Sequence, residues 1–328
     1  MSPVSWLAGI DIGGTKCAVC LGEIEGSGIR ISARRSFPTD NGNTTPYSVI
    51  RRLIATLDEL LLEQGSPRLL AIGISCGGPL DSRQGLILSP PNLPGWNGVD
   101  MVRPLREHYG IAVGLQNDAN ACALAEWKWG AGRGSHNMVF LTFGTGMGAG
   151  LILNGALYSG TNDMAGEIGH MRLEASGPDG YGKAGSFEGY CSGGGIAKLA
   201  RSMALEELRK GERPLFCPKA GMLDAITAKK VGEAAAQGDP LALKVWGIVG
   251  KQLGRGLAVL VDLLNPELIV IGSIYGRQQP LLEPLVMQEL QREALPYSMS
   301  VCRIVPAQLS EQIGDYASLS VASSMLPS

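Results

Sequence analysis

Near the start of the chain lies a glycine-rich turn whose residue types could bind phosphate. Within GIDIGGTK, Asp11 ends a short apolar run and is followed by Gly13, Gly14, Thr15 and Lys16. Glycines let backbone amides face an anion with no Cβ in the way, and the hydroxyl and the cation add further donors. A carboxylate beside a phosphate repels it unless a cation lies between them, so Asp11 is predicted to hold Mg²⁺, directly or through water. The alternative is a tight hairpin turn capped by Asp11.

A second turn of this kind lies in the middle of the chain. The run GTGMGAG contains Gly144, Thr145 and Gly146 and is similar to the glycine fingerprint of dinucleotide-binding proteins. That fingerprint must open a helix, whereas the strand-like run LILNG follows here, so a Rossmann dehydrogenase is disfavoured. The loop has no GK[ST] ending, which excludes a P-loop. Two glycine hairpins remain, and together they could grip one polyphosphate from both sides.

Asn117 and Asp118 lie where a predicted strand meets a predicted helix, between IAVGLQ and ANACALAEW. Strand ends in open α/β sheets are a usual place for ligands, and a helix N-terminus stabilises an ionised Asp. Such a carboxylate can orient a substrate hydroxyl and accept its proton. Asp is also a preferred N-cap residue, so the alternative is that Asp118 only starts the helix.

The elements that must position these residues alternate between strand and helix, which indicates an α/β fold. Apolar and alternating runs predict strands within 5–35, at 69–75, 111–116, 137–143 and 149–155, and in ELIVIG and SVCRIV. Thr45 and Pro46 predict a helix start. Further helices are predicted over 119–130, 187–208, 227–237, 241–264, 280–294 and 316–322.

The two glycine turns also suggest an internal duplication. DIGGTKCAVCLGEI from residue 11 and TFGTGMGAGLILNG from residue 142 share the pattern of strand, glycine turn and strand. Their separation is too long for a solenoid repeat. A duplicated domain is therefore predicted, with a boundary near 118–135.

Composition limits the classes of function. The net charge of −2, from 28 basic and 30 acidic residues, gives no general electrostatic reason for binding nucleic acid or an anionic membrane. The chain has no long uninterrupted apolar run and no basic leader at its start, so neither a membrane span nor a signal peptide is expected. Seven cysteines, an odd number, suit free thiols in the cytoplasm.

Eight motifs resemble, in the same order, those of the ROK sugar kinases: DIGGTK, SCGGPLD, NLPGW, NDANACALAEW, LTFGTGMGAGLILNG, AGEIGH, FEGYCSG and LNPELIVIGS. The resemblance covers nearly the whole chain. It implies an α/β actin-like ATPase fold, in which two duplicated ribonuclease-H-like domains enclose a cleft. The domains are expected over 1–118 and 119–328, with the last helix packed back on the first. A homodimer or homotetramer is also implied.

The resemblance implies a role for each matching residue. Asp118 is implied as the base that faces the 6-hydroxyl of a sugar. The implied sugar-binding residues are Gly78, Asn92, Asn117, Asp118, Glu167, His170 and Glu188. The implied ATP-binding residues are Gly13, Gly14, Thr15, Lys16, Gly144, Thr145, Gly146, Gly272 and Ser273, where Ser273 replaces a glycine usual in the family. Carboxylates suit a hexose because they accept charge-assisted hydrogen bonds from hydroxyls. Alternatively, Glu167 and His170 could merely pair on a helical turn.

One part of the family pattern is missing. Most members carry a zinc site made of a His and the run C-x-C-G-x-x-G-C, but this chain has DGYGKAGS over 179–186. Asp179, Tyr181 and Ser186 occupy the three cysteine positions, and only His170 remains. Structural zinc requires four nitrogen or sulfur ligands, so no zinc is expected.

The resemblance therefore implies a phosphotransferase with an alcohol acceptor. With ATP and Mg²⁺ it would phosphorylate the 6-hydroxyl of a hexose or an N-acetylhexosamine. One alternative is a sugar-responsive transcription regulator of the same family. Against it, the first strand starts near residue 6, where no room is left for a DNA-binding domain, so no nucleic-acid partner is expected. A catalytically weak sugar-binding relic is the other alternative.

Overall fold

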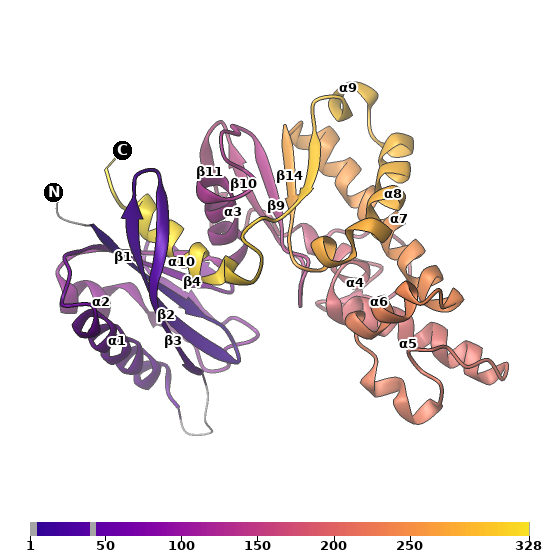
Figure 1. The fold of residues 1–328 in the computed structure, drawn as a ribbon, viewed down its shortest axis with the longest axis horizontal. Coiled ribbons are helices and arrows are strands. Elements are labelled where there is room, and N and C mark those ends of the chain that lie inside the picture. The colour runs from indigo at the N-terminus through magenta and orange to yellow at the C-terminus, as the bar shows by residue number, and fades with distance from the viewer. Residues whose placement is uncertain (1–4, 40–43, 328) are drawn as a thin grey trace. The chain divides into compact units, whose positions relative to one another are not determined.

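The computed structural model describes residues 5–39 and 44–327 and contains two compact units (Figure 1). The first unit comprises Met1–His136, Gly150–Ala165 and Gln308–Ser328, and the second comprises Asn137–Ala149 and Gly166–Ala307. Each unit is thus built from segments that are distant in the sequence. The domain boundary predicted at residue 118 stays a prediction.

A five-stranded sheet forms the centre of the first unit. Its strands are β1 (Trp6–Ile12), β2 (Lys16–Glu25), β3 (Gly28–Pro38), β4 (Leu69–Cys76) and β8 (Ala112–Asn117). Their order is β3-β2-β1-β4-β8. β2 pairs antiparallel with both β1 and β3, whereas β1, β4 and β8 run parallel. The strands predicted in these regions are confirmed.

Helices cover both faces of this sheet. Alternate residues of β1, such as Ile10, pack on one face with α1 (Pro46–Glu63) and α2 (Val102–Tyr109). The opposite face, which includes Leu7, packs against α10 (Ile313–Ser324), and α10 also contacts α3 (Asp118–Trp129). The helix start predicted at Thr45 and Pro46 is confirmed, since Thr45 is the N-cap of a capping box with Ser48.

The C-terminal helix lies very close to the sheet. A Cβ built on Gly73 of β4 would lie 2.1 Å from the carbonyl oxygen of Ser318, and one built on Gly9 of β1 would lie 2.3 Å from the Ser318 hydroxyl oxygen. Only glycine allows this approach of strand and helix backbones. The helix predicted over 316–322 is therefore present, and it begins three residues earlier at Ile313.

Smaller strands complete the first unit. β5 (Leu80–Asp81), β6 (Leu86–Leu88) and β7 (Asn97–Asp100) form a three-stranded sheet that the sequence analysis did not predict. β10 (Ala149–Leu153) matches the strand predicted over 149–155 and pairs antiparallel with β11 (Ala156–Tyr158).

The second unit combines three parallel strands with long helices. β14 (Leu268–Ile271) pairs with β9 (Met138–Leu141) on one side and with β15 (Arg303–Pro306) on the other. The helices are α5 (Gly193–Arg209), α6 (Ala228–Ala236), α7 (Pro240–Leu264), α8 (Ile274–Glu293) and the short α4 (Phe187–Tyr190) and α9 (Pro296–Met299). Three 3₁₀ turns occur in the described chain: η1 (Ile168–His170), η2 (Ala220–Ala225) and η3 (Ser310–Gln312), the last of these in the first unit.

Two helix predictions in this unit need correction. The single helix predicted over 187–208 is two helices, because Ser192 has an extended backbone and its hydroxyl caps α5 by accepting from the Gly195 amide at 3.0 Å. The helix predicted over 280–294 begins at Ile274 and is kinked at Gln278, two residues before Pro280. Among the helices of the described residues, none has both the length and the apolar composition that a membrane span requires.

The close contact at Gly73 can be tested by substitution. We expect Gly73→Ala to lower the free energy of unfolding by roughly 1–3 kcal/mol, because the new methyl group must displace backbone atoms of α10. Gly77→Ala is the matched control, since a Cβ there meets nothing within 4 Å. Urea unfolding compares the two variants. Equal stability of both would show that α10 does not pack on β4 as described.

Candidate active site

Asp11 lies at the carboxyl end of β1, beside Ser75 of β4, with which it is in register. The Ser75 hydroxyl is hydrogen-bonded to the Asp11 side chain. Burial, followed by the negative charges of Asp118 and Asp315, raises the pKa of Asp11 from 3.8 to about 6, while Ser75 and Lys16 act in the opposite direction. The ionised form of Asp11 is therefore unfavourable in this environment, and a nearby positive charge would stabilise it.

Asp118 is the first residue of α3, directly after β8. The N-cap is Asn117, whose side-chain oxygen accepts from the Ala119 amide at 2.9 Å. The N-cap alternative for Asp118 is thus wrong, although its Oδ1 also accepts from Ala119 at 2.8 Å. Residue 118 is exposed to solvent, yet its carboxylate lies among enough protein atoms for desolvation to raise its pKa.

The first glycine loop turns its carbonyl groups toward the protein. The Lys16 carbonyl accepts from the Gly13 amide at 3.0 Å, the Gly13 carbonyl from the Thr39 hydroxyl at 2.6 Å, and the Thr15 carbonyl from the Thr39 amide at 3.1 Å. No hydrogen bond to another described residue is found for the amides of Gly14 and Thr15. These two amides are available to an anion.

Two further predicted residues join this group in the first unit. A Cβ on Gly14 would lie 2.5 Å from the carbonyl oxygen of Asn92, so the first glycine loop and the NLPGW segment touch. A Cβ on Gly78 would lie 3.0 Å from Nδ2 of Asn117. Asn92 thus lies beside the loop that follows Asp11 in the chain, and Gly78 lies beside Asn117, which directly precedes Asp118.

In the second unit, Glu188 of α4 is joined to the second glycine loop. Its Oε2 accepts a hydrogen bond from the Met147 amide at 3.0 Å, and a Cβ on Gly146 would lie 2.9 Å from the same oxygen. Glu167 is exposed, and His170 is an exposed residue of the 3₁₀ turn η1.

The second glycine loop also meets two helix starts at the ends of parallel strands. The Gly193 amide at the beginning of α5 donates to the Gly144 carbonyl at 2.7 Å, and the Ile274 amide of α8 donates to the Phe143 carbonyl at 2.8 Å. Gly272 follows β14, and its amide donates to the Leu141 carbonyl at 2.9 Å. Ser273 has a φ of 44°, a left-handed conformation that suits the glycine usual in the family.

The predicted residues thus form two groups, one in each unit. The first group is Asp11, Gly13, Gly14, Thr15, Lys16, Gly78, Asn92, Asn117 and Asp118. The second is Gly144, Thr145, Gly146, Glu167, His170, Glu188, Gly272 and Ser273. That the two groups together bind one sugar and one ATP stays a prediction.

Sequence analysis missed several residues that shape these groups. Ser75, Thr39 and Asp315 act on Asp11 or on the first loop, and nothing in their local sequence indicates this. Ser192 was detectable, because serine is a preferred N-cap residue.

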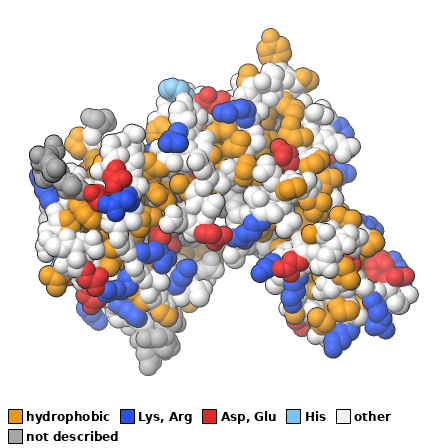
Figure 2. Space-filling view, in the orientation of Figure 1, with side chains coloured by type: hydrophobic (Ala, Val, Ile, Leu, Met, Phe, Trp, Pro, Cys, Tyr) orange, Lys and Arg blue, Asp and Glu red, His pale blue; other side chains and the backbone are white. Residues whose placement is uncertain are grey.

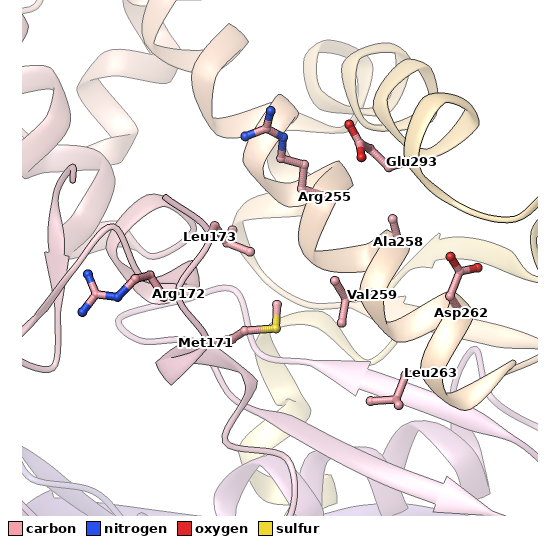
Figure 3. A pocket seen from close by; sticks show the side chains of 9 residues that line it. All are labelled: Met171, Arg172, Leu173, Arg255, Ala258, Val259, Asp262, Leu263 and Glu293. Atoms are coloured by element: carbon pink, nitrogen blue, oxygen red, sulfur yellow. The ribbon is translucent and has the colours of Figure 1, made fainter. Parts of the chain in front are cut away.

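A pocket of about 640 Å³ lies elsewhere in the second unit (Figure 3). It is lined by Met171, Arg172, Leu173, Arg255, Ala258, Val259, Asp262, Leu263 and Glu293. None of these is a predicted site residue. Arg255 is paired with Glu174 and Glu289, and the rest of the lining combines apolar side chains with the charged residues Arg172, Asp262 and Glu293. We therefore assign the candidate active site to the residues at the strand ends and not to this pocket.

The raised pKa of Asp11 predicts a pH-dependent stability. The folded protein binds this proton more tightly than the unfolded chain, so the stabilisation is complete below about pH 4 and is lost as pH rises through about 6. Without Mg²⁺ and nucleotide, Asp11→Asn should melt at a higher temperature than wild type at about pH 8, and the difference should shrink toward about pH 4. Thermal unfolding across this range measures it.

The control for this experiment is Asp224→Asn, whose side chain is 97% exposed. It should follow the wild-type curve at every pH. A melting difference for Asp11→Asn that does not change with pH would contradict the raised pKa.

Comparisons with known proteins identify the family of the chain. The model of the ROK family matches residues 7–322. The chain is 31% identical to a glucokinase of Thermotoga maritima over 96% of each protein. It is 29% identical to the DNA-binding transcriptional repressor Mlc of Escherichia coli, covering 80% of this chain and 64% of Mlc.

Among solved structures, the chain is similar to a ROK family glucokinase from Streptomyces griseus in complex with glucose and AMPPNP. The TM-score is 0.75 at 28% identity, covering 98% of this chain and 99% of that one. The predicted actin-like ATPase fold is confirmed by this likeness. The family model and the relatives together show that the chain belongs to the ROK family.

Proposed function

We propose that this chain is an ATP-dependent kinase that transfers the γ-phosphoryl group to the 6-hydroxyl of a hexose or N-acetylhexosamine. Its relatives include proteins named glucokinase, and the enzyme class is that of a phosphotransferase with an alcohol acceptor. The observation that carries the proposal is the placement of Asp118 at the start of α3, close enough to Asp11 for its charge to raise the pKa of that residue.

Asp118 serves as the general base in this proposal. Desolvation raises its pKa, which makes it a stronger base than a fully hydrated aspartate. Oxygen 6 of the sugar forms the new bond to the γ-phosphorus, the bond from that phosphorus to the β-bridging oxygen breaks, and the hydroxyl proton passes to the Asp118 carboxylate. ADP and a sugar 6-phosphate are the products.

Asp11, with Asp118 nearby, would hold Mg²⁺, directly or through water. Magnesium is usually bound by one or two carboxylates together with substrate phosphates, which fits the Asp11 carboxylate beside a phosphate loop. When bound, the ion neutralises charge on the phosphates. The Asp11 side chain, oriented by Ser75, is the chain's own contribution at this point.

The two glycine loops and the β14 end are proposed to bind ATP. Gly14 and Thr15 offer amides, and Lys16 adds a cation at the same turn. The loop at Gly144, Thr145 and Gly146, together with Gly272 and Ser273, lies at the carboxyl ends of parallel strands, where α/β proteins usually bind ligands.

Sugar hydroxyls are proposed to bind to both groups of residues. Asn92, Asn117 and Asp118 would act from the first unit, with Gly78 giving room for close approach. Glu167, His170 and Glu188 would act from the second. A bound sugar would cover these donors and acceptors, and they would then give specificity, because a missing hydroxyl would leave one of them unpaired.

A sugar-responsive regulator remains the second candidate, because Mlc is a relative. On the face drawn in Figure 2, basic and acidic side chains are interspersed, which offers no continuous basic surface to DNA there. A gel-shift assay with and without sugar separates the two functions. A catalytically weak relic would bind sugar without turnover.

The predictions about oligomeric state, nucleic-acid binding and cellular location belong to the same proposal. We propose a homodimer or homotetramer without a nucleic-acid partner, working in the cytoplasm. All seven cysteines are free thiols in the structure, which suits a reducing compartment.

Replacement of the proposed base gives the direct test. Asp118→Asn preserves size and should bind glucose with a Kd within about threefold of wild type, because Asn still offers an oxygen to a hydroxyl. It should lose about 10²–10⁴-fold in kcat, the usual contribution of a general base. A coupled assay of ADP release against a panel of hexoses and N-acetylhexosamines measures kcat, and calorimetry measures Kd.

The exposed Asp224→Asn substitution is the matched control and should keep wild-type turnover. If wild type releases no ADP with any sugar of the panel, the kinase proposal fails. If Asp118→Asn keeps full turnover, another residue is the base.

A further inference from the structure

We propose that in this chain a β-hairpin, rather than a metal ion, positions His170, with Lys183 and Tyr181 as the positioning residues. The inference rests on the proposed function, in which His170 binds a sugar hydroxyl. It concerns the segment that replaces the zinc-binding run usual in the family.

The residues at the former cysteine positions do not fit a zinc site. Asp179 pairs with Lys198 of α5 at 2.9 Å. Ser186 is fully buried, and its hydroxyl oxygen caps α4 by accepting from the Gly189 amide at 3.1 Å. A tyrosine is not among the usual zinc ligands. Within the described ranges, no three His, Cys, Asp or Glu side chains are grouped so that they could hold a metal ion.

In place of a metal-bound loop, this segment forms a tight hairpin. β12 (Asp179–Gly180) pairs antiparallel with β13 (Lys183–Ala184). The two residues between them, Tyr181 and Gly182, have φ values of 47° and 72°. Positive φ at both central positions is the requirement of a type I′ turn, the turn that best matches strand twist. Hydrogen bonding of the backbone therefore orders a loop that the family usually orders with zinc.

Two side chains of this hairpin reach His170. The Lys183 ammonium donates to the His170 carbonyl oxygen at 2.8 Å. The ring of Tyr181 meets the imidazole edge to face, with centroids 6.2 Å apart and an interplanar angle of 79°. In the described chain the imidazole nitrogens make no hydrogen bond, so the orientation of the ring depends on Tyr181 and on the backbone that Lys183 holds.

Tyr181 has a conformation that is unfavourable unless something compensates for it. A left-handed backbone is unfavourable for a residue other than glycine, and Tyr181 is 71% exposed, so burial offsets little of this cost. Asn or Gly would suit the turn better. The ring contact with His170 is a feature that neither of these residues could supply.

The hairpin is itself fixed to rigid elements. Lys198 donates to the Asp179 carbonyl oxygen at 3.0 Å as well as to its carboxylate. The Gly185 carbonyl accepts from the Leu173 and Glu174 amides at 2.9 and 3.1 Å. Glu174 is in turn bound to Arg255 and Gln252 of α7. His170 is therefore connected through the hairpin to α5 and α7, without a metal.

Imidazole NMR tests the contact directly, because the chain has only three histidines. Tyr181→Ala should shift the ring C–H signals of His170 by removing the aromatic ring current, and should leave His108 and His136 unchanged. Tyr181→Phe keeps the ring and should restore the wild-type position. Tyr297→Ala, which removes a 92% exposed tyrosine, is the matched control.

Kinetics with glucose test the consequence for binding. Lys183→Met keeps most of the length of the side chain but not its charge. It should raise KM about tenfold while lowering kcat less, because the His170 carbonyl loses a hydrogen bond from a charged group. Lys183→Arg should restore part of the affinity. Lys229→Met on α6 is the matched control, since that side chain is 85% exposed. Equal melting temperatures for the variants would exclude general unfolding.

Metal analysis completes the test. The purified protein should contain zinc well below one atom per chain, and a chelator should not change the His170 signals. Stoichiometric zinc, or His170 signals that do not move in Tyr181→Ala, would overturn the inference. NMR and metal content need no turnover, so their outcome is separate from a failure of the kinase proposal, which only the sugar panel decides.

Discussion

Two carboxylates of the same charge, Asp11 and Asp118, are kept near each other at the ends of β1 and β8, and the rest of the site depends on this constraint. Desolvation and the negative charges of Asp118 and Asp315 disfavour the ionised form of Asp11, whose pKa is raised to about 6. Folding alone does not relieve that cost. A cation, together with the phosphates it accompanies, would relieve it, which supports the proposed binding of Mg²⁺ at Asp11.

The sheet and its C-terminal helix maintain this arrangement. Parallel pairing of β1, β4 and β8 aligns Asp11 with Ser75 and brings Asn117 beside Cys76 at the same edge. α10 returns from the far end of the chain and lies on Gly9 and Gly73. Its Asp315 is bound by Arg34 and contributes to the raised pKa of Asp11. The electrostatics of the first glycine loop thus depend on residues about 300 positions away in the chain.

Local signals made much of this predictable. Thr45 with Pro46 gave the start of α1, and the glycine turns and the pair Asn117–Asp118 were visible because they follow apolar strands. The sequence did not reveal long-range contacts, such as Thr39 with the first loop or α10 with Gly73, because no local pattern encodes them. The sequence shows only that Tyr181 occupies the position of a zinc-binding cysteine. It does not predict the hairpin, because the turn requires a positive φ at Tyr181, which a tyrosine rarely adopts.

The central claim is that Asp118 directs a sugar hydroxyl at the γ-phosphate of ATP. Phosphorus NMR of a reaction with ATP, Mg²⁺ and glucose tests it most directly, because it reports the bond that is made. The account predicts a new phosphomonoester coupled to the protons on carbon 6 of the sugar, formed by wild type. The appearance of inorganic phosphate alone, or of the ester at an undiminished rate with Asp118→Asn, would contradict it.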